Sequence, residues 1–372
     1  MEIFGAVLQD DGKQQPYADS QPLEIQRLSL SEPGPTEVLV RMEAAGVCHS
    51  DLSVVNGNRK RPLPMLLGHE ASGIVVAAGA ETSEGLVGQR VVMTFLPRCE
   101  SCDNCAEGGR LPCTTGSRSN EQGTLLTGSR HLSREGEDVN HHLGVSGFAT
   151  HSVVDEASIV PVGDDVPADV AAVLGCAVLT GGGALINAAA PEDRHSVMIV
   201  GLGGVGMAAL LAAVARGTRR IIAVDMSQEK LDLALSLGAH EAYTSTEVAE
   251  QGIRADRVIE CVGHARAFET AFQATAVGGR TVTAGLPAPD AMSTISPLTI
   301  TAEARSVVGS YLGSSVPKVD IPRYEQWWRE GRLPVEKLIS HRIRLEDINQ
   351  AMDDLSSGKA LRQIILFDES AA

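Results

Sequence analysis

Aromatic residues, positive charge and long apolar runs are all scarce in this 372-residue sequence. Aromatic side chains make up only 3% of the chain, so the core must be built mainly from aliphatic residues, as α/β sheets often are. Lys and Arg number 31 against 47 Asp and Glu, and the net charge of −16 argues against binding to nucleic acid or to an anionic membrane. We find no run of about 18 apolar residues and expect no transmembrane helix.

Cysteine is also sparse, with seven residues, and the amino-terminal segment lacks the basic end and apolar stretch of a signal peptide. A reducing, cytoplasmic location is therefore expected. The length allows two domains with a sizeable core in each, and a hydrophobic content of 43% is ordinary for a globular protein.

The pattern of predicted secondary structure differs between two regions of the chain. The first 175 or so residues read as strands and turns, for example at Glu37–Met42 and Gly73–Ala78. From about residue 178, strands and helices alternate, which predicts a parallel, doubly wound sheet. After about Tyr311, helices and a last strand at Gln363–Phe367 follow. The polar stretch from Cys113 to Ser146 has little periodicity and is interpreted as a long loop.

A glycine-rich loop marks the second region. The apolar strand Ser196–Val200 runs into Gly201-Leu202-Gly203-Gly204-Val205-Gly206, which opens an apolar helix. In such a loop Gly201 permits the tight turn, Gly203 lets the backbone approach a pyrophosphate, and Gly206 allows close packing of helix on strand. The sequence therefore predicts a dinucleotide-binding site.

The nature of the dinucleotide is indicated by Asp225, which ends the next strand. Its carboxylate can accept both ribose hydroxyls and would repel a 2′-phosphate. No Arg follows it in Met226–Glu229, so the sequence favours NAD over NADP. The alternative is that Asp225 caps the helix that begins near Ser227.

Four of the seven cysteines lie within fifteen residues, in the pattern C-x2-C-x2-C-x7-C formed by Cys99, Cys102, Cys105 and Cys113. Four thiolates at such short separations can close a tetrahedral shell around Zn²⁺. Because such a shell leaves no open position, this zinc would shape the loop and take no part in chemistry. The alternative, two disulfides, is disfavoured because nothing in the sequence suggests secretion.

The other three cysteines are Cys48, Cys176 and Cys261. Cys48 begins Cys-His-Ser-Asp, and a Gly-His-Glu segment containing His69 follows. A Cys₂His set leaves Zn²⁺ one open position for substrate or water. Taken alone, each of these cysteines, and His69, could equally be an ordinary buried structural residue. We assign that structural role to Cys261.

Read together, these motifs resemble the zinc-dependent medium-chain alcohol dehydrogenases over nearly the whole chain. The match includes Gly46–Asp51, Gly68–Glu70, the four-cysteine loop, Thr180-Gly181, the glycine-rich loop, Asp225 and Leu361–Phe367. The segment from Gly123 to Gly144 is similar to the longer loop of the branch that includes the animal and glutathione-linked enzymes. The resemblance implies an α/β protein with a GroES-like, mainly-β catalytic domain (residues 1–177 and 312–372) and a Rossmann NAD-binding domain (residues 178–311).

The resemblance also implies roles for individual residues. Cys48, His69 and Cys176 would be the ligands of a catalytic zinc, and Glu70 a neighbouring or transient ligand. Asp51 would orient His69 through its other ring nitrogen, and Ser50 would pass on the substrate proton. The remaining cofactor contacts implied are Thr180 and Val205 at the nicotinamide, Lys230 at the adenosine ribose, His49 and Arg362 at the pyrophosphate, and the loop glycines Gly201, Gly203, Gly204 and Gly206.

The chain departs from the family pattern at two places. Some relatives end the proton relay with a histidine where this chain has Ser53. Where relatives have an apolar substrate pocket, this chain offers Arg59, Arg118 and His142, while Phe95 and Leu143 stay apolar. The two arginines are either exposed loop residues or readers of a polar or anionic substrate tail.

The expected function is a zinc-dependent enzyme that interconverts an alcohol and its aldehyde or ketone with NAD, contains two zinc ions per chain, and forms a homodimer or homotetramer. Alternatives are an aldehyde reductase, a dehydrogenase of thiol adducts of the S-hydroxymethyl type, or an inactive zinc- and NAD-binding protein. No nucleic-acid or membrane partner is expected.

Overall fold

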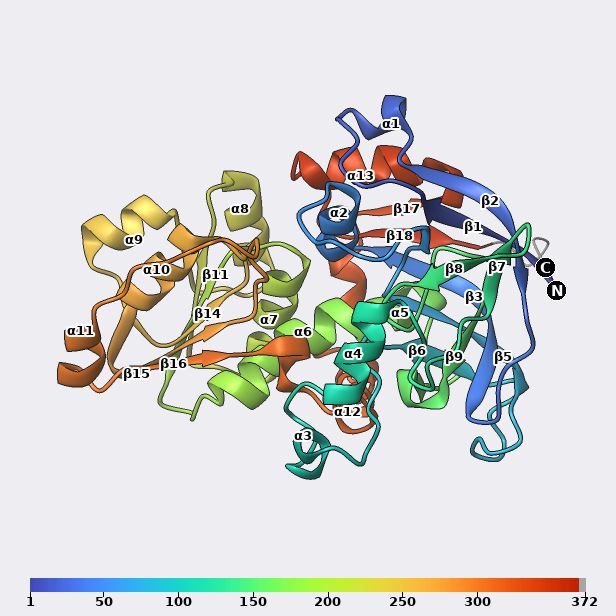
Figure 1. The fold of residues 1–372 in the computed structure, drawn as a ribbon. Helices are drawn as coiled ribbons and strands as arrows, with labels where there is room; N and C mark the ends of the chain where they lie inside the picture. Colours follow the sequence, from blue (N-terminus) through green and yellow to red (C-terminus); the bar gives the residue numbers. More distant parts are fainter. Residues whose placement is uncertain (368–372) are drawn as a thin grey trace. The chain divides into compact units, whose positions relative to one another are not determined.

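The computed structural model describes residues 1–367, which form two compact units (Figure 1). The first unit contains Met1–Cys176 and the segment from Ile339 onward, and the second contains Ala177–Leu338. The first unit is mainly β and the second alternates strands and helices, so the predicted mixed α/β fold class is confirmed.

The first unit is built on a closed barrel and a seven-stranded sheet. The long strand β3 (Glu37–Val47) of the sheet pairs with three antiparallel neighbours. Buried aliphatic residues of β3 contribute to the core of the sheet. The barrel strands are, in order, β1 (Glu2–Leu8), β2 (Leu23–Leu30), β7 (Leu132–Arg134), β8 (Glu137–His141) and β4 (Met65–Leu66). The sheet strands are β10 (Ile159–Pro161), β6 (Arg90–Met93), β5 (Ala71–Ala78), β3 (Glu37–Val47), β18 (Gln363–Leu366) and β17 (His341–Ile343), with β9 (His151–Asp155) also on β3.

Short helices connect these strands. The connectors are α1 (Tyr17–Ser20), α2 (His49–Val55), α3 (Asp103–Ala106), α4 (Thr114–Gln122), η1 (Glu156–Ser158), α5 (Ala168–Val173), η6 (Leu345–Asp347) and α13 (Ile348–Ser356). Helix α13 buries Ile348, Met352 and Leu355 and contributes them to the core of the sheet.

The interpretation of residues 113–146 as one long loop is wrong. This segment contains α4 and the hairpin β7–β8, and the hairpin closes the barrel by pairing with β2 and β4. Polar residues such as Asn140 form these strands because their backbone groups find partners on distant strands, which local periodicity does not record.

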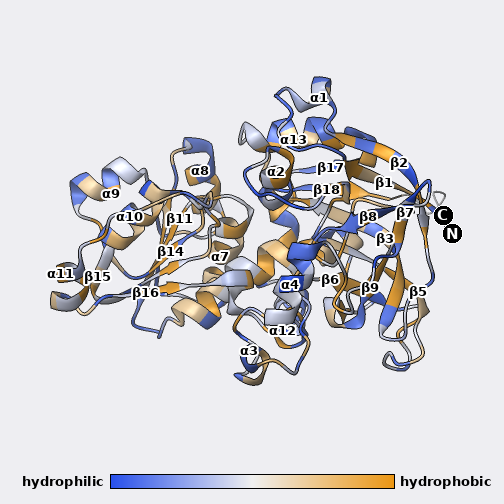
Figure 2. Ribbon diagram, viewed as in Figure 1, coloured by the Kyte–Doolittle hydropathy of each residue, from blue (hydrophilic) through white to orange (hydrophobic). Residues whose placement is uncertain are grey.

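The second unit holds a six-stranded parallel sheet of mainly apolar strands (Figure 2). Its order is β13 (Glu241–Tyr243), β12 (Arg220–Val224), β11 (Ser196–Val200), β14 (Ala255–Glu260), β15 (Thr275–Thr283) and β16 (Ser306–Gly309). Its helices are α6 (Leu179–Gly183), α7 (Gly204–Ala215), α8 (Gln228–Ser236), α9 (Ser245–Gln251), α10 (Ala265–Gln273), α11 (Pro297–Ala302) and α12 (Pro317–Arg329), with the turns η3 (Ala184–Ala189), η4 (Tyr311–Ser314) and η5 (Val335–Leu338). In chain order this is 3-2-1-4-5-6, the Rossmann arrangement.

Residues 312–338, which the resemblance places in the catalytic domain, lie in the second compact unit. Helix α12 packs on α6, where a side chain on Gly182 would collide with the ring of the buried Tyr324. This close helix–helix contact, made possible by a glycine, joins α12 to the second unit, and the boundary in the structure follows Leu338.

One helical segment, Ala168–Ala189, bears on the expectation that the chain has no transmembrane helix. Its 22 residues are long and apolar enough, by length and composition, to cross a membrane. Of an 18-residue apolar window in this segment, 89% is buried within the protein, as in the core helix of a globular fold.

Candidate functional site

Cys48 and Asp51 are placed by the start of helix α2. Cys48 follows β3 and occupies the N-cap position, and Asp51 stands three residues later. Oδ2 of Asp51 accepts the backbone N–H of Cys48 at 3.0 Å, so the two residues close a capping box. Both side chains are buried, Asp51 completely.

His69 is positioned by the preceding glycine and by Asp51. Gly68 has a φ of +91°, and a Cβ there would lie 2.5 Å from the backbone nitrogen of Phe148. Nδ1 of His69 lies 2.9 Å from Oδ1 of Asp51 in a fully buried contact. With Nδ1 thus engaged, Nε2 is the ring nitrogen left to bind a metal ion.

Cys176 completes a group of three ligating atoms. It lies in η2 (Leu174–Val178), a π-helical turn, beside Gly175, whose Cβ would meet the carbonyl oxygen of Met93 at 2.2 Å. Sγ of Cys176 lies 3.6 Å from Nε2 of His69. The ligating atoms of Cys48, His69 and Cys176 all lie within 4.8 Å of one another and all three residues are buried.

Charges at this cluster are strongly coupled. A hydrogen bond with Cys176 and the nearby Arg362 guanidinium hold the pKa of Cys48 well below its ordinary value, although burial opposes them. Burial alone would lower the pKa of His69, but Asp51 and Cys48 raise it well above the usual range. The site therefore favours the thiolate form of Cys48, the form in which cysteine binds metals, whereas the hydrogen bond with Cys48 and burial raise the pKa of Cys176 well above its ordinary value.

Glu70 and Arg362 form an ion pair beside Cys48. The two side chains are 0% and 4% exposed, and Nη1 of Arg362 lies 3.4 Å from Oε2 of Glu70. Burial raises the pKa of Glu70 to about 7, against the opposing effect of Arg362. Glu70 fits only because residue 46 is glycine, whose Cβ would lie 2.0 Å from Oε1 of Glu70. Arg362 also donates to the carbonyl of Val47 at 3.2 Å.

The residues expected to line a substrate pocket differ in burial and in the contacts they make. Phe95 and Leu143 are buried, and the Phe95 ring packs edge-on against His69 with centroids 5.5 Å apart. Arg59 is half-buried, and Arg118 is exposed on α4. His142 is fully buried, and its Nδ1 lies 3.3 Å from Oδ1 of Asp51. No sequence pattern predicts the contact between His142 and Asp51, because the two residues are far apart in the chain.

The four-cysteine segment forms a second group of ligating atoms. The Sγ atoms of Cys99, Cys102, Cys105 and Cys113 all lie within 4.8 Å of one another. All four are free thiols, and the 3.9 Å between the sulfurs of Cys102 and Cys113 is far longer than a disulfide bond. The sulfur of Cys113 accepts the backbone N–H groups of Cys99 and Gly116, both at 3.3 Å. The disulfide alternative therefore does not describe this loop.

The glycine-rich loop joins β11 to α7 in the second unit. Gly201 has a φ of +91°, and a Cβ on Gly206 would lie 1.8 Å from the carbonyl oxygen of Gly201. Gly203 is different, since a Cβ there would have no neighbour within 4 Å. The loop is thus tight at Gly201 and Gly206 and open at Gly203, beside the amides that begin α7.

Asp225 lies directly after β12 and faces this loop. Its Oδ2 accepts the N–H of Leu202 at 2.7 Å, and its Oδ1 accepts the N–H of Ser227 at 3.0 Å. The N-cap of α8 is Ser227, whose hydroxyl accepts the N–H of Lys230, so the alternative role of Asp225 as that cap is wrong.

The remaining candidate cofactor residues lie on both units. Thr180 is on α6, and the neighbouring Gly181 would, with a Cβ, meet the carbonyl oxygen of Val205 at 2.1 Å. Residues 180 and 205 are therefore brought together by a close helix–helix contact. Lys230 is half-buried on α8, and in the first unit His49 is exposed and Ser50 half-buried at the start of α2.

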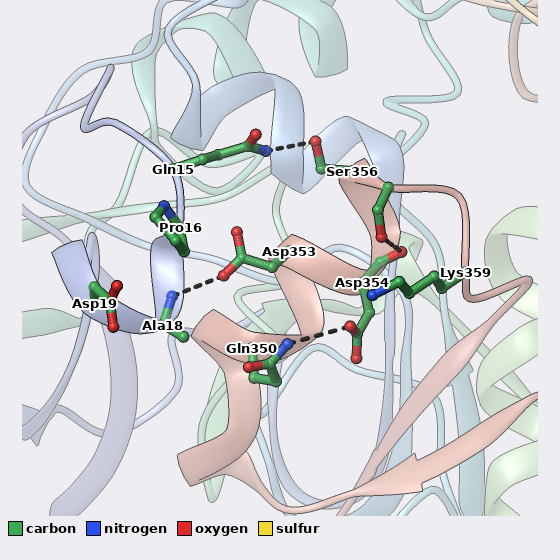
Figure 3. Close-up of a pocket in the computed structure, with 10 residues that line it drawn as sticks. Gln15, Pro16, Ala18, Asp19, Gln350, Asp353, Asp354, Ser356 and Lys359 are labelled. Carbon is green, nitrogen blue, oxygen red and sulfur yellow. Dashed lines mark hydrogen bonds between the residues drawn. The ribbon is translucent and has the colours of Figure 1, made fainter.

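A separate pocket of about 580 Å³ lies between α1 and α13 in the first unit (Figure 3). Its polar groups largely satisfy one another, because Asp353 accepts the N–H groups of Tyr17 and Ala18, both at 2.8 Å, and Gln350 donates to Asp354 at 3.2 Å. The residues that line it are Gln15, Pro16, Ala18, Asp19, Gln350, Asp353, Asp354, Ser356, Ser357 and Lys359. It shares no residue with the two ligand groups.

Comparisons with known proteins agree with this architecture. Residues 34–164 match the model of the alcohol dehydrogenase GroES-like domain, and residues 204–329 match that of the zinc-binding dehydrogenase. The chain is 33% identical to putative alcohol dehydrogenase D of Mycobacterium tuberculosis, over 98% of this chain and 100% of the relative.

Two solved structures are similar over the whole chain. An alcohol dehydrogenase zinc-binding domain protein from Burkholderia ambifaria has a TM-score of 0.91 and 31% identity, and benzyl alcohol dehydrogenase from Acinetobacter calcoaceticus has a TM-score of 0.90 and 31% identity. Each comparison covers 99% of this chain and 100% of the other.

A Rossmann sheet with a glycine-rich loop, joined to a GroES-like domain, defines a nicotinamide-dependent oxidoreductase. The chain belongs to the zinc-dependent medium-chain alcohol dehydrogenase family. The predicted family and enzyme class are therefore confirmed: this is a zinc-containing alcohol oxidoreductase that acts on a small-molecule alcohol and uses a nicotinamide cofactor.

Proposed function

We propose that the protein is an NAD-linked alcohol dehydrogenase whose catalytic zinc is held by Cys48, His69 and Cys176. The observation that carries this assignment is the convergence of these three buried side chains within 4.8 Å. In a tetrahedral zinc site, sulfur and nitrogen ligands at their usual bond lengths lie roughly 3.6 Å apart. The 3.6 Å between Cys176 Sγ and His69 Nε2 fits that geometry.

A zinc ion held there supplies Lewis acidity, which favours ionisation of an alcohol and polarises a carbonyl in the reverse reaction. The chain's own residues do the rest of the work. Asp51 fixes the ring of His69 through the 2.9 Å contact at Nδ1. Ser50 relays the alcohol proton, because its hydroxyl accepts that proton while it passes its own to water. Ser53, which donates to the carbonyl of His49 at 2.8 Å, offers the relay no imidazole base. Glu70 is proposed as a neighbouring or transient ligand.

The second zinc is proposed to lie in the four-cysteine loop and to stabilise it. Four sulfur donors within 4.8 Å match a closed tetrahedral shell, in which sulfurs lie roughly 3.8 Å apart. The 3.9 Å between Cys102 and Cys113 supports this reading. A chain with both sites filled carries two zinc ions.

NAD is proposed as the cofactor rather than NADP. Support comes from Asp225, whose carboxylate stands at the end of β12 and holds the glycine-rich loop through Leu202. A 2′-phosphate next to this carboxylate would be repelled. We propose Thr180 and Val205 at the nicotinamide, Lys230 at the adenosine ribose, His49 and Arg362 at the pyrophosphate, and Gly201, Gly203, Gly204 and Gly206 as its cradle.

The zinc and enzyme assignments share one experiment. Cys48→Ala and His69→Ala should lower turnover by at least about a thousandfold, while the variants stay folded and bind NAD. Elemental analysis should give two zinc ions per wild-type chain and one per variant chain. Near-native activity in either variant would refute the catalytic assignment. A single zinc in the wild-type protein would favour the alternative of an inactive zinc- and NAD-binding protein. The preferred direction of the reaction, measured with NAD and with NADH, separates an alcohol dehydrogenase from an aldehyde reductase.

The substrate is proposed to carry a polar or anionic tail, with Arg59 as its reader. Arg59 is half-buried, whereas the exposure of Arg118 fits an ordinary surface position. An adduct of a thiol such as glutathione is a second candidate of the same chemistry. Comparing kcat/KM for a plain alcohol and its ω-carboxylate analogue decides the matter. We expect at least a tenfold preference for the carboxylate in the wild type and its loss in Arg59→Ala, and equal efficiency would refute the proposal.

A homodimer or homotetramer is proposed, with association through the edge of the cofactor-binding sheet. Strand β16 ends that sheet, and its Val307 is 37% exposed. Light scattering that gives the mass of one chain would refute the assembly. A reducing, cytoplasmic location is supported by the seven free cysteines and is tested by cell fractionation.

A further inference from the structure

His142 is a buried imidazole next to the metal-binding cluster, and the function proposed above gives it no role. Its side chain is fully buried, and its Nδ1 lies 3.3 Å from Oδ1 of Asp51. The same oxygen is 2.9 Å from Nδ1 of His69. The rings of His69 and His142 stand nearly perpendicular, at 86°, with centroids 5.5 Å apart. One carboxylate oxygen therefore lies between two imidazoles.

The backbone holds His142 in this position. Its N–H donates to Oγ of Ser146 at 2.9 Å, and its carbonyl accepts the N–H groups of Val145 and Ser146. The hydroxyl of Ser146 in turn donates to the carbonyl of Leu66 at 3.0 Å. Leu66 lies three residues before His69, so the turn that carries His142 is tied to the segment that carries His69.

Asp51 is consequently held at both oxygens. Oδ2 accepts the N–H of Cys48 at 3.0 Å, while Oδ1 lies between His69 and His142. Cys48 and His69 are two of the three proposed zinc ligands. Partners of this kind, one bond removed from a metal ligand, fix its tautomer and orientation, and their loss typically changes metal affinity or activity by 10–100-fold.

We propose that His142 is a positioning residue that, through Oδ1 of Asp51, holds the ring of His69 in the orientation that binds the metal. The inference rests on the proposed zinc at Cys48, His69 and Cys176. It differs from the role expected from the sequence, in which His142 lines the substrate pocket. A pocket residue would act on KM for particular alcohols, whereas a positioning residue acts on metal retention and on kcat for every alcohol.

The test compares three variants at residue 142. His142→Phe keeps the size of the ring and removes both nitrogens, His142→Asn places an amide N–H near the position of Nδ1, and His142→Leu removes the donor at a size close to that of Asn. The readouts are folding by circular dichroism, the rate at which excess chelator removes zinc, and kcat and KM for two alcohols of different size. Zinc release from the catalytic site is identified as the kinetic phase that wild-type protein shows and Cys48→Ala lacks.

We expect zinc release from this site to be about tenfold faster in the Phe and Leu variants and to return to within about twofold of wild type in the Asn variant. The kcat for both alcohols should fall with zinc retention, while KM changes by less than about twofold. If His142→Phe does not fold, the Leu and Asn variants still allow zinc release to be compared without and with an N–H group near the position of Nδ1.

His141→Phe is the matched control. His141 is the neighbouring residue and is equally buried, but its Nε2 accepts the N–H of His131 at 3.2 Å in a different network. We expect it to alter thermal stability and to leave zinc release unchanged.

The outcomes separate the two proposals. Wild-type zinc release in both His142→Phe and His142→Leu, or KM effects confined to one alcohol, would overturn the positioning role and leave the zinc site intact. If the wild-type protein and Cys48→Ala release the same amount of zinc, no zinc is bound at Cys48. That result would refute the proposed function, and the role of His142 would be refuted with it.

Discussion

Single buried carboxylates determine much of the chemistry of the first unit. Asp51, Glu70 and Glu37 are each almost fully buried, and each is held by a different kind of partner. Asp51 lies between two imidazoles and Glu70 faces a buried guanidinium. Since an isolated buried charge is costly, the partner of each carboxylate decides whether it stays ionised.

Glu37 shows this outside the metal-binding cluster. Its side chain accepts the N–H of Gly34 at 2.7 Å and the hydroxyls of Ser129 and Thr127 at 2.6 and 2.8 Å, and Nε2 of His131 lies 2.6 Å away. Burial alone would raise the pKa of Glu37, but these hydrogen bonds lower it to about 2. The ionised side chain therefore ties β3 to the segment 127–131.

We expect Glu37→Gln to lower the free energy of unfolding by up to about 3 kcal/mol at pH 7. Because the folded pKa of about 2 lies below the ordinary 4.5, the contribution is complete above pH 4.5 and is lost as the pH falls toward 2. Denaturant unfolding of wild type and variant at several pH values measures this. The gap should be largest at pH 7 and shrink between pH 4.5 and 2.

Glu137→Gln is the control for this prediction, because Glu137 is an exposed carboxylate of the same unit. Its effect should stay within about 0.5 kcal/mol at every pH. A difference between wild type and Glu37→Gln that stays constant down to pH 2 would contradict the assignment.

At the scale of elements, β11, the glycine-rich loop and α7 form the unit that the sequence predicts best. The predicted strand Ser196–Val200 matches β11, and the predicted helix through about Arg216 ends at Ala215. The match is close because the turn, the helix start and the apolar periodicity are all local properties of consecutive residues.

Two glycines of this unit should respond differently to alanine. A Cβ on Gly206 would collide with the carbonyl oxygen of Gly201 at 1.8 Å, so Gly206→Ala should cost about 3 kcal/mol of stability. A Cβ on Gly203 has no neighbour within 4 Å, so Gly203→Ala should cost no more than about 1 kcal/mol. It would occupy space needed by a pyrophosphate, and NADH affinity should fall at least about tenfold.

Thermal unfolding and NADH fluorescence titration measure these two effects separately. Equal losses of stability in the two variants would show that the contacts around Gly203 are misassigned. Undiminished NADH binding by Gly203→Ala would show that the phosphates lie elsewhere.

Other elements were less predictable. The polar composition of segment 113–146 predicts a loop, yet the segment supplies the barrel strands β7 and β8. Its strands are short and polar, and they form because β2 and β4 offer backbone partners that lie far away in the sequence. Strand formation of this kind depends on pairing and leaves little trace in local composition.

At the scale of the whole molecule, each unit contributes one half of the proposed reaction. The first brings Cys48, His69 and Cys176 together, and the second carries the glycine-rich loop. The division between them differs from the expected one at residues 312–338, where α12 packs on α6 through Tyr324 and Gly182. That contact joins segments more than 100 residues apart.

The sequence alone determined the Rossmann region, the four-cysteine loop and the family, since each depends on residues at short, fixed spacings. It also named Cys48, His69 and Cys176 as candidate ligands through resemblance. Only the tertiary structure decided that these three side chains meet, that His142 shares Asp51 with His69, and that Arg118 is exposed. The physical reason is that such contacts join distant segments through strand pairing and close packing, and neither is encoded in the spacing of neighbouring residues.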